Sequence, residues 1–310
     1  MGKSTRRDVL KYSGWLTLVA AAGFPANLPA YELAALDIAY AGSMASLMEG
    51  RLKALAAQTL KLEMHGRAQG SSALAQLIVA GSIRPDVFMP ITPGPMMMVL
   101  KAGKAESAQA IAHTEMVIAY SPRSRFAPRF DAAAKGKENW WEILQEPGLR
   151  FGRPDPVTDP QGRNIIFTMM LAAKTYQQSN LVEKVLGPAI NEKQIFSEST
   201  VQARLQSGEL DAASAYKVQP GPFNLPYISL PKAINLSGES VHADHPDVSL
   251  SVGGKTYTPE PLIYYAAVLK DALNSKGAVA FAEWLKGEEA QGIFRRHDYG
   301  PPEGASALHA

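Results

Sequence analysis

The 310-residue chain contains no cysteine. This absence excludes disulfide bonds, thiolate sites and a lipid-modified N-terminal cysteine, but it is compatible with the cytoplasm and with a periplasm alike. The chain also lacks a block of basic residues, and its formal net charge is only +2. Nothing in the charge pattern therefore indicates a nucleic acid or a membrane surface as a partner.

Several sequence signatures are missing as well. The chain has no internal repeat, no low-complexity tract, and no Ser-His-Asp, Walker or dinucleotide-binding motif. Hydrophobic residues make up 46% of the chain and charged residues 19%, as in globular proteins with substantial cores. Because the length exceeds that of one average domain, we expect two domains of about 100–150 residues.

The N-terminus carries the features of an export signal. Residues 5–11 (TRRDVLK) look like a twin-arginine motif, and the apolar stretch 15–24 follows them. That stretch is too short to span a bilayer. It therefore favours a signal peptide that comprises residues 1–30, and hence an exported protein. An amphipathic leader or an uncleaved helix is the alternative.

From residue 36 onward, short apolar runs alternate with helical patterns, which is typical of βαβ units around mostly parallel sheets. This pattern predicts an α/β fold with two lobes joined by crossover segments near residues 115–120 and 218–228. A single large sheet is the less natural alternative. The expected strands are 36–40, 61–64, 87–90, 116–120, 149–152 and 210–216, and the expected helices include 140–144, 164–176, 199–206 and one amphipathic helix over 279–293.

Four polar turns lie between an apolar run and the start of a helix, at residues 42–43, 70–72, 159–162 and 197–199. Helix N-termini present unpaired N–H groups and a partial positive charge, so they suit anions. In open α/β sheets such turns gather at the carboxyl edge of the strands, where ligands bind. The turns therefore indicate an anion-binding site between the lobes.

The same turns have a purely structural interpretation. Ser, Asp and Glu are common at helix starts, so Ser43 and Ser72 could cap their helices. Asp159 before Pro160 is a usual helix start, and Glu198 could answer the helix dipole. The pattern of residues alone leaves both interpretations open.

Residues 37–300 resemble the periplasmic molybdate/tungstate-binding proteins of ABC importers, and in particular the tungstate-type branch. The order and approximate spacing of the family's motifs hold along nearly all of the mature chain. The resemblance implies a type II periplasmic-binding-protein fold, with two Rossmann-like lobes, a two-segment hinge and closure on the ligand. It is carried by residues 40–43, 70–75, 84–88, 152–162, 205–211, 216–217 and 231–236, of which 152–162 is the most specific.

The resemblance also implies lobes and site residues. The first lobe would comprise residues 36–117 and 226–300, and the second residues 118–225. Ser43 and Ser71 would donate to the oxyanion from the first lobe, and the Gln161 N–H and the Tyr216 hydroxyl from the second. In the tungstate-type branch two carboxylates also approach the metal centre and make it six-coordinate; Asp159 and Glu198 fall on those positions.

A carboxylate pair beside a dianion needs a physical reason. At ~4 Å and an effective dielectric constant near 20, each like-charge contact costs about 4 kcal/mol. The arrangement makes sense if the carboxylate oxygens bond the electrophilic Mo or W centre and do not face its oxo groups. Sulfate has no comparable orbitals and would be rejected. We hypothesise that Asp159 and Glu198 set this selectivity.

The chain departs from the family pattern at three places. Arg163 and Asn164 follow the Asp-Pro-x-Gly turn where the family often has an aromatic residue, Gln161 replaces a residue that is usually small, and residues 217–220 replace a Lys/Arg-Ser continuation. These changes bear on the identity of the anion more than on the fold.

The sequence thus predicts a monomeric, non-enzymatic solute-binding protein without a cofactor, which delivers tungstate or molybdate to an ABC permease. A binder of another oxyanion or of a small organic acid is the nearest alternative. A hydrolase that uses Asp159 and Glu198 as general acid and base is a further one, although no nucleophile accompanies them. A sensor without a transporter also remains open.

Overall fold

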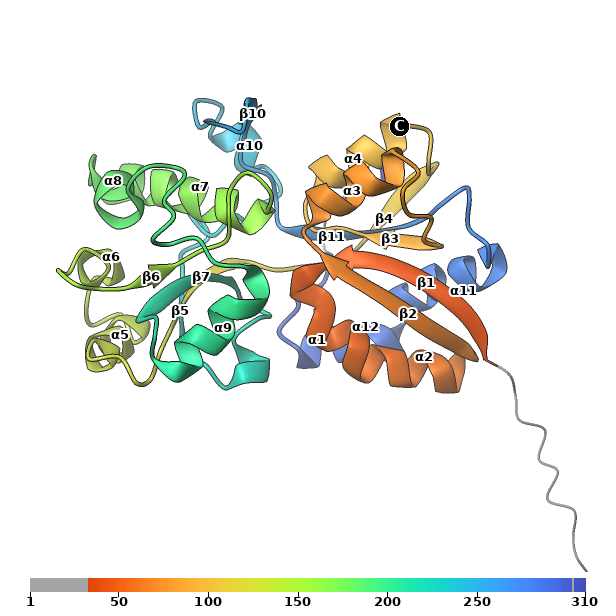
Figure 1. Ribbon diagram of the computed structural model, residues 1–310, viewed down its shortest axis with the longest axis horizontal. Helices are drawn as coiled ribbons and strands as arrows, with labels where there is room; N and C mark the ends of the chain where they lie inside the picture. Colours follow the sequence, from red (N-terminus) through yellow and green to blue (C-terminus); the bar gives the residue numbers. More distant parts are fainter. Residues whose placement is uncertain (1–32, 303) are drawn as a thin grey trace, which may run out of the picture. The chain divides into compact units, whose positions relative to one another are not determined.

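The computed structural model describes residues 33–302 and 304–310; the predicted signal peptide, residues 1–30, lies outside them. Two β-sheets organise the unit Leu33–Ala310, one with six strands and one with four (Figure 1). We call the six-stranded sheet with its helices the first lobe, and the four-stranded sheet with its helices the second lobe. In the part of the chain that the structure describes, no helix is long and apolar enough to cross a membrane.

The sheet of the first lobe has the strand order β12-β4-β11-β3-β1-β2. β1 pairs in parallel with β2 and β3, as expected for strands joined by helical crossovers. β11 is antiparallel to β3 and β4, and β12 is antiparallel to β4. The strands are β1 (Ala34–Ala41), β2 (Leu62–Gln69), β3 (Val87–Met89), β4 (Ser107–His113), β11 (Ile263–Val268) and β12 (Leu308–His309).

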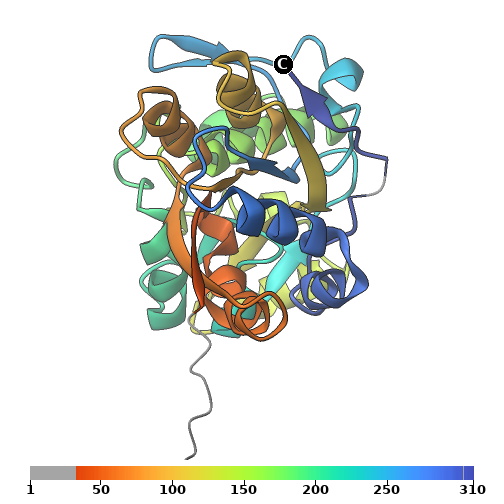
Figure 2. The same cartoon turned by 90° about the vertical axis from the view of Figure 1, so that its right-hand side faces the viewer.

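Helices cover both faces of this sheet, because its strands alternate apolar residues between the two faces. Ala39 and Phe88 pack in the cluster that includes α3 (Ser71–Val79) and α4 (Pro93–Lys101). Ile38 and Tyr40 belong to the cluster on the other face. The helices there are α1 (Ala45–Leu47), α2 (Lys53–Thr59), α11 (Ser275–Lys286) and α12 (Glu288–Arg296) (Figures 1 and 2).

The sheet of the second lobe has the order β6-β7-β5-β8, with β6 parallel to β7 and β5 antiparallel to both of its neighbours. Val117 and Ala119 of β5 pack in one cluster with Val201 and Leu205 of α9. The strands are β5 (Met116–Tyr120), β6 (Phe151–Gly152), β7 (Ala212–Tyr216) and β8 (Tyr227–Ser229), and the helices are α5 (Ala127–Ala134), α6 (Trp140–Ile143), α7 (Pro160–Thr175), α8 (Leu181–Leu186) and α9 (Glu198–Ser207).

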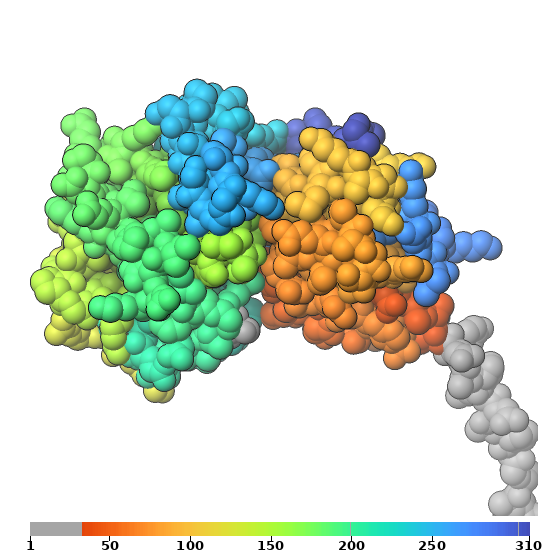
Figure 3. All heavy atoms as spheres, turned by 45° about the horizontal axis from the view of Figure 1, so that its top comes forward, coloured from red at the N-terminus to blue at the C-terminus, as the bar shows by residue number. Residues whose placement is uncertain are grey.

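Between β8 and β11 the chain makes an excursion that contains α10 (Val241–Asp244) and a hairpin of β9 (Leu250–Val252) and β10 (Lys255–Tyr257). Asp247 in this excursion pairs with Lys174 of α7. In the space-filling view the excursion, in light blue, lies against the green α7 region (Figure 3). The excursion thus contacts the surface of the second lobe before the chain returns to the first lobe.

The two-lobe α/β fold expected from the sequence is confirmed, with corrections of detail. The sheets are mixed and not mostly parallel, because β5 and β11 run against their neighbours. The expected helix 279–293 is two helices that meet at Gly287, where the backbone is extended. β8 pairs with β5 in the four-stranded sheet. The crossover segments and the lobe boundaries expected from the sequence remain predictions.

Candidate functional site

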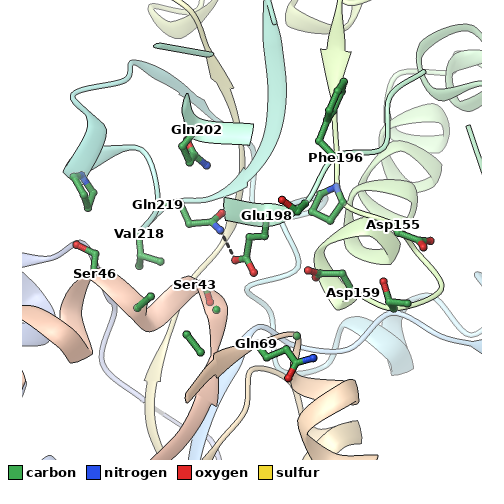
Figure 4. Close-up of a pocket in the computed structure, with 18 of the residues that line it drawn as sticks. Ser43, Ser46, Gln69, Asp155, Asp159, Phe196, Glu198, Gln202, Val218 and Gln219 are labelled. Carbon is green, nitrogen blue, oxygen red and sulfur yellow. Dashed lines mark hydrogen bonds between the residues drawn. The ribbon is translucent and has the colours of Figure 1, made fainter. Parts of the chain in front are cut away.

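A pocket of about 850 Å³ opens where the two lobes face each other. Helix and strand ends from both lobes line it: Gly42 and Gly70 come from the first lobe, and Asp159 and Glu198 begin helices of the second. Figure 4 shows Glu198 between Ser43 and Asp159, with the Asp159 carboxylate turned towards Glu198. The pocket therefore concentrates negative charge next to several helix N-termini.

Glu198 is the first residue of α9, and its carboxylate reaches across to the first lobe. A Cβ atom added to Gly42 would collide with this carboxylate. Gln219 donates a hydrogen bond from Nε2 to Glu198 Oε1 at 2.6 Å and, through its own Oε1, accepts one from the Tyr216 N–H at 2.7 Å. The Glu198 side chain is thus held between Gly42 of the first lobe and the Gln219 amide of the second.

Asp159 caps helix α7, and its Oδ1 accepts a hydrogen bond from the Gln161 N–H at 2.8 Å. Pro160 occupies the first helical position, which favours this helix start. The structural interpretation of Asp159 as a cap is therefore correct for one carboxylate oxygen. It does not account for the position of the residue in the pocket wall, close to Glu198 and Gly70.

Burial raises the pKa of both carboxyl groups. For Asp159, burial outweighs the opposing effects of the Gln161 N–H and the Arg163 guanidinium. For Glu198, burial and then the charge of Asp159 raise the pKa well above its usual range, against the hydrogen bond from Gln219. Two carboxylates that each disfavour the ionised form of the other need a compensating positive centre to be charged together.

The two serines expected in the first lobe have different surroundings. Ser43 lines the pocket, and its Oγ lies 2.9 Å from the Tyr264 hydroxyl of β11. Tyr299 donates to the Ser43 carbonyl at 3.3 Å, so two tyrosines fix this residue. Ser71 is buried, and its Oγ accepts from the Ile91 N–H at 3.1 Å. Neither serine caps its helix through its side chain.

Gln161 and Tyr216 lie behind the pocket wall and are buried. The Gln161 N–H is bonded to Asp159, and its side chain donates to the Ser214 carbonyl at 2.8 Å. The Tyr216 hydroxyl accepts from Asn164 Nδ2 at 3.0 Å. Burial and then the charge of Asp159 raise the pKa of Tyr216, so its hydroxyl stays protonated at neutral pH.

The structure brings Ser43, Asp159 and Glu198 together in the pocket wall and places Ser71, Gln161 and Tyr216 just outside it. Gln219, which holds Glu198 in place, was not expected. The sequence marked this residue only as part of a departure from the family pattern. Tyr264 was also missed, because a tyrosine in an apolar strand gives no signal beyond core packing.

The pocket is not a conventional metal site. In the described ranges, 33–302 and 304–310, no group of three or more His, Cys, Asp or Glu side chains is placed to hold a metal ion. Asp159 and Glu198 supply two carboxylates, which is too few to enclose a bare cation. A metal centre held here would have to bring other oxygen ligands with it.

The two lobes, the chain crossings between them and the pocket at their junction define a two-lobe solute-binding protein of the type II periplasmic class. Residues 36–300 match the model of the bacterial extracellular solute-binding protein family. The chain belongs to this family.

Individual relatives agree with this assignment. The chain is 28% identical over 285 residues to the molybdate/tungstate-binding protein WtpA of Thermococcus kodakarensis, covering 84% of this chain and 80% of that one. It is 33% identical over 207 residues to WtpA of Pyrococcus abyssi, covering 60% of this chain and 59% of that one, which is less than two thirds of the relative's length. The periplasmic molybdate-binding protein of Azotobacter vinelandii has a similar fold, with a TM-score of 0.59 at 15% identity, over 86% of this chain and all (100%) of that one.

Proposed function

We propose that this protein captures tungstate or molybdate between its two lobes outside the cytoplasm and delivers the anion to an ABC permease. The observation that carries the proposal is the half-buried pair of carboxyl groups, Asp159 and Glu198, in the pocket wall at the junction of the lobes. The names of the WtpA relatives support the choice of anion.

The carboxylate pair selects for an expandable metal centre. A bare dianion would be repelled by two ionised carboxylates, since each pair of unit charges at ~4 Å and an effective dielectric constant near 20 costs about 4 kcal/mol. A molybdenum or tungsten centre can instead accept one oxygen from each carboxylate, so that attraction to the metal replaces repulsion between oxygens. Sulfur offers no such bonds, and sulfate would meet only the repulsion.

The remaining donors would hold the oxo groups. Ser43 lies in the pocket wall, and the starts of α3 and α9 supply N–H groups without intrahelical partners. Because Asn164 donates to the Tyr216 oxygen, the proton of Tyr216 is left for an oxyanion oxygen. The Gln161 N–H would become available to the anion when Asp159 turns its oxygen to the metal. Ser71 would donate its N–H and its hydroxyl.

Isothermal titration calorimetry of the anion-free protein tests the proposal. Tungstate, molybdate, sulfate and a small organic acid such as citrate are titrated in separate runs. We expect saturable binding of tungstate and molybdate and no heat with sulfate. Binding of citrate alone would instead favour the organic-acid alternative, for which the pocket volume leaves room. No binding of any of the four would overturn the proposal.

Export and transport are part of the same proposal. Membership of an extracellular solute-binding family and the twin-arginine-like segment at residues 5–11 support export. Replacing Arg6 and Arg7 by lysine should retain the protein in the cytoplasm, which cell fractionation measures. Normal export of this variant would remove the twin-arginine route from the proposal and leave anion binding untouched.

A further inference from the structure

Arg163, in the first turn of α7, joins three segments that are far apart in the sequence. Its side chain is buried, although it carries a permanent charge. Nη1 donates to the Pro156 carbonyl at 2.9 Å, and Nη2 donates to Ser72 Oγ at 3.1 Å. The guanidinium also lies over the ring of Tyr257 in β10, 4.3 Å from its centroid.

The hydrogen bond to Ser72 crosses between the lobes. Ser72 lies in the first turn of α3 of the first lobe, whereas Arg163 lies in the first turn of α7 of the second. The two helix starts are close at this point, since a Cβ atom built on Gly70 would lie 3.2 Å from the Thr158 carbonyl oxygen. A hydrogen bond of this kind forms only while the lobes are together. It therefore stabilises the closed arrangement, in which residues of both lobes line the pocket.

We propose that Arg163 is a positioning residue for oxyanion capture: through its hydrogen bond to Ser72 it fastens α3 to α7 when the lobes close on the anion. This inference rests on the proposed function. Because the hydrogen bond crosses between the lobes, its loss should favour the open arrangement without removing a group that touches the anion.

Four variants test this contact. Arg163→Met removes both the charge and the hydrogen bond, whereas Arg163→Lys keeps the charge and loses the planar fork. Ser72→Ala removes the partner of the hydrogen bond and leaves the charge. Arg125→Met is the matched control, because Arg125 also donates to a carbonyl (Pro147, 2.9 Å) and lies over an aromatic ring (Phe126, 4.6 Å), but both of these partners belong to its own lobe.

The first measurement follows the closure of the lobes. Small-angle X-ray scattering gives the radius of gyration of each variant with and without tungstate. We expect Arg163→Met and Ser72→Ala to have a larger radius than the wild type and Arg125→Met, because the hydrogen bond that joins α3 to α7 is lost. Equal radii in all of these proteins under both conditions would overturn the inference.

The second measurement is tungstate affinity. Arg163→Met and Ser72→Ala should each bind about tenfold more weakly than the wild type, whereas Arg125→Met should bind as the wild type does. Because the two substitutions remove the same hydrogen bond, adding Ser72→Ala to Arg163→Met should cost little further affinity. Equal affinities of Ser72→Ala, Arg163→Met and Arg125→Met would contradict the inference. Absence of tungstate binding by the wild type would overturn the proposed function instead, and the scattering of the anion-free variants would still judge the contact.

Discussion

The carboxylate of Glu198 lies against the Cα atom of Gly42, so that the start of α9 in the second lobe contacts the end of β1 in the first. Glycine is required here by the close approach and not by its backbone conformation, since a Cβ atom would collide with the carboxylate oxygens. Gln219 holds the same carboxylate from the other side at 2.6 Å. The Glu198 side chain thus contacts the first lobe only while the two lobes are together.

Gly42→Ala should therefore weaken tungstate binding by displacing Glu198 without removing any polar group. We expect about a tenfold loss, which corresponds to about 1.4 kcal/mol of binding free energy. Calorimetry measures the affinity, and Gly238→Ala is the control, because nothing lies within 4 Å of a Cβ atom at Gly238. Equal affinity of the Gly42→Ala variant and the wild type would show that Glu198 is not held in the position that binding needs.

The cap and ligand roles of Asp159 can be distinguished by two substitutions. Asparagine is as good an N-cap as aspartate, whereas alanine loses about 0.5–2 kcal/mol of stability. We therefore expect Asp159→Asn to be at least as stable as the wild type at neutral pH, because it also removes a carboxyl group whose pKa is raised by burial, and Asp159→Ala to have a lower Tm than Asp159→Asn. Both should lose tungstate affinity by at least about 100-fold, because neither supplies a carboxylate to the metal. Unchanged tungstate affinity in Asp159→Ala would refute the carboxylate mechanism.

Glu198→Gln should stabilise the anion-free protein at neutral pH. Burial and then the charge of Asp159 raise the pKa of Glu198 above its ordinary value of 4.5, so its ionisation opposes folding. The wild type carries no such cost below about pH 4.5, and the cost grows as the pH rises towards the pKa in the folded protein. The variant's excess free energy of unfolding should accordingly be small at pH 4.5 and reach about 1 kcal/mol or more at pH 8.

Urea denaturation at the two pH values measures this difference between variant and wild type, which cancels the contribution of other titrating groups. The variant should at the same time lose tungstate binding. A variant less stable than the wild type at pH 8 would mean that the ionised Glu198 is already stabilised in the anion-free protein.

Asp211 serves as a structural comparison, because it is a buried acid outside the pocket. Burial alone would raise its pKa, but hydrogen bonds from Arg150 and Ser124 lower it below the ordinary value of 3.8. Asp211→Asn should cost about 1–3 kcal/mol of stability, since the half-exposed Arg150 limits the strength of the pair. That stabilisation is present above about pH 3.8 and is lost as the pH falls through the lowered pKa.

Calorimetry and thermal unfolding together test this comparison. The Asp211→Asn variant should have a lower Tm and the tungstate affinity of the wild type. A large loss of affinity in this variant would mean that general destabilisation, and not the loss of a ligand, explains the Asp159 variants.

Much of the fold could be predicted from periodicity. The strand over 116–120 was predicted with its observed bounds, because five consecutive apolar residues are bounded by polar ones. Helix α4 was missed, since Pro93, Gly94 and Pro95 look like a loop, although proline is well tolerated in a first helical turn. The antiparallel course of β11 depends on a return from the second lobe, which local sequence does not encode.

The candidate site could be predicted only in part. Helix-start residues such as Asp159 and Glu198 have a local signature, and the family resemblance added their proposed roles. Gln219 and Tyr264 act through contacts across long stretches of chain: Gln219 bonds to Glu198, and Tyr264 bonds to Ser43. No local pattern marks such residues. Arg163 was visible in the sequence as a departure from the family pattern, but its partners Ser72 and Tyr257 required the fold.

Tungsten L3-edge X-ray absorption of the tungstate-loaded protein tests the central claim most directly, because it counts the oxygen atoms bonded to the metal. The account predicts a six-coordinate tungsten in the wild type, with two longer bonds to Asp159 and Glu198 that decrease in number in Asp159→Asn and Glu198→Gln. A four-coordinate tetrahedral tungsten in the wild-type protein would contradict it.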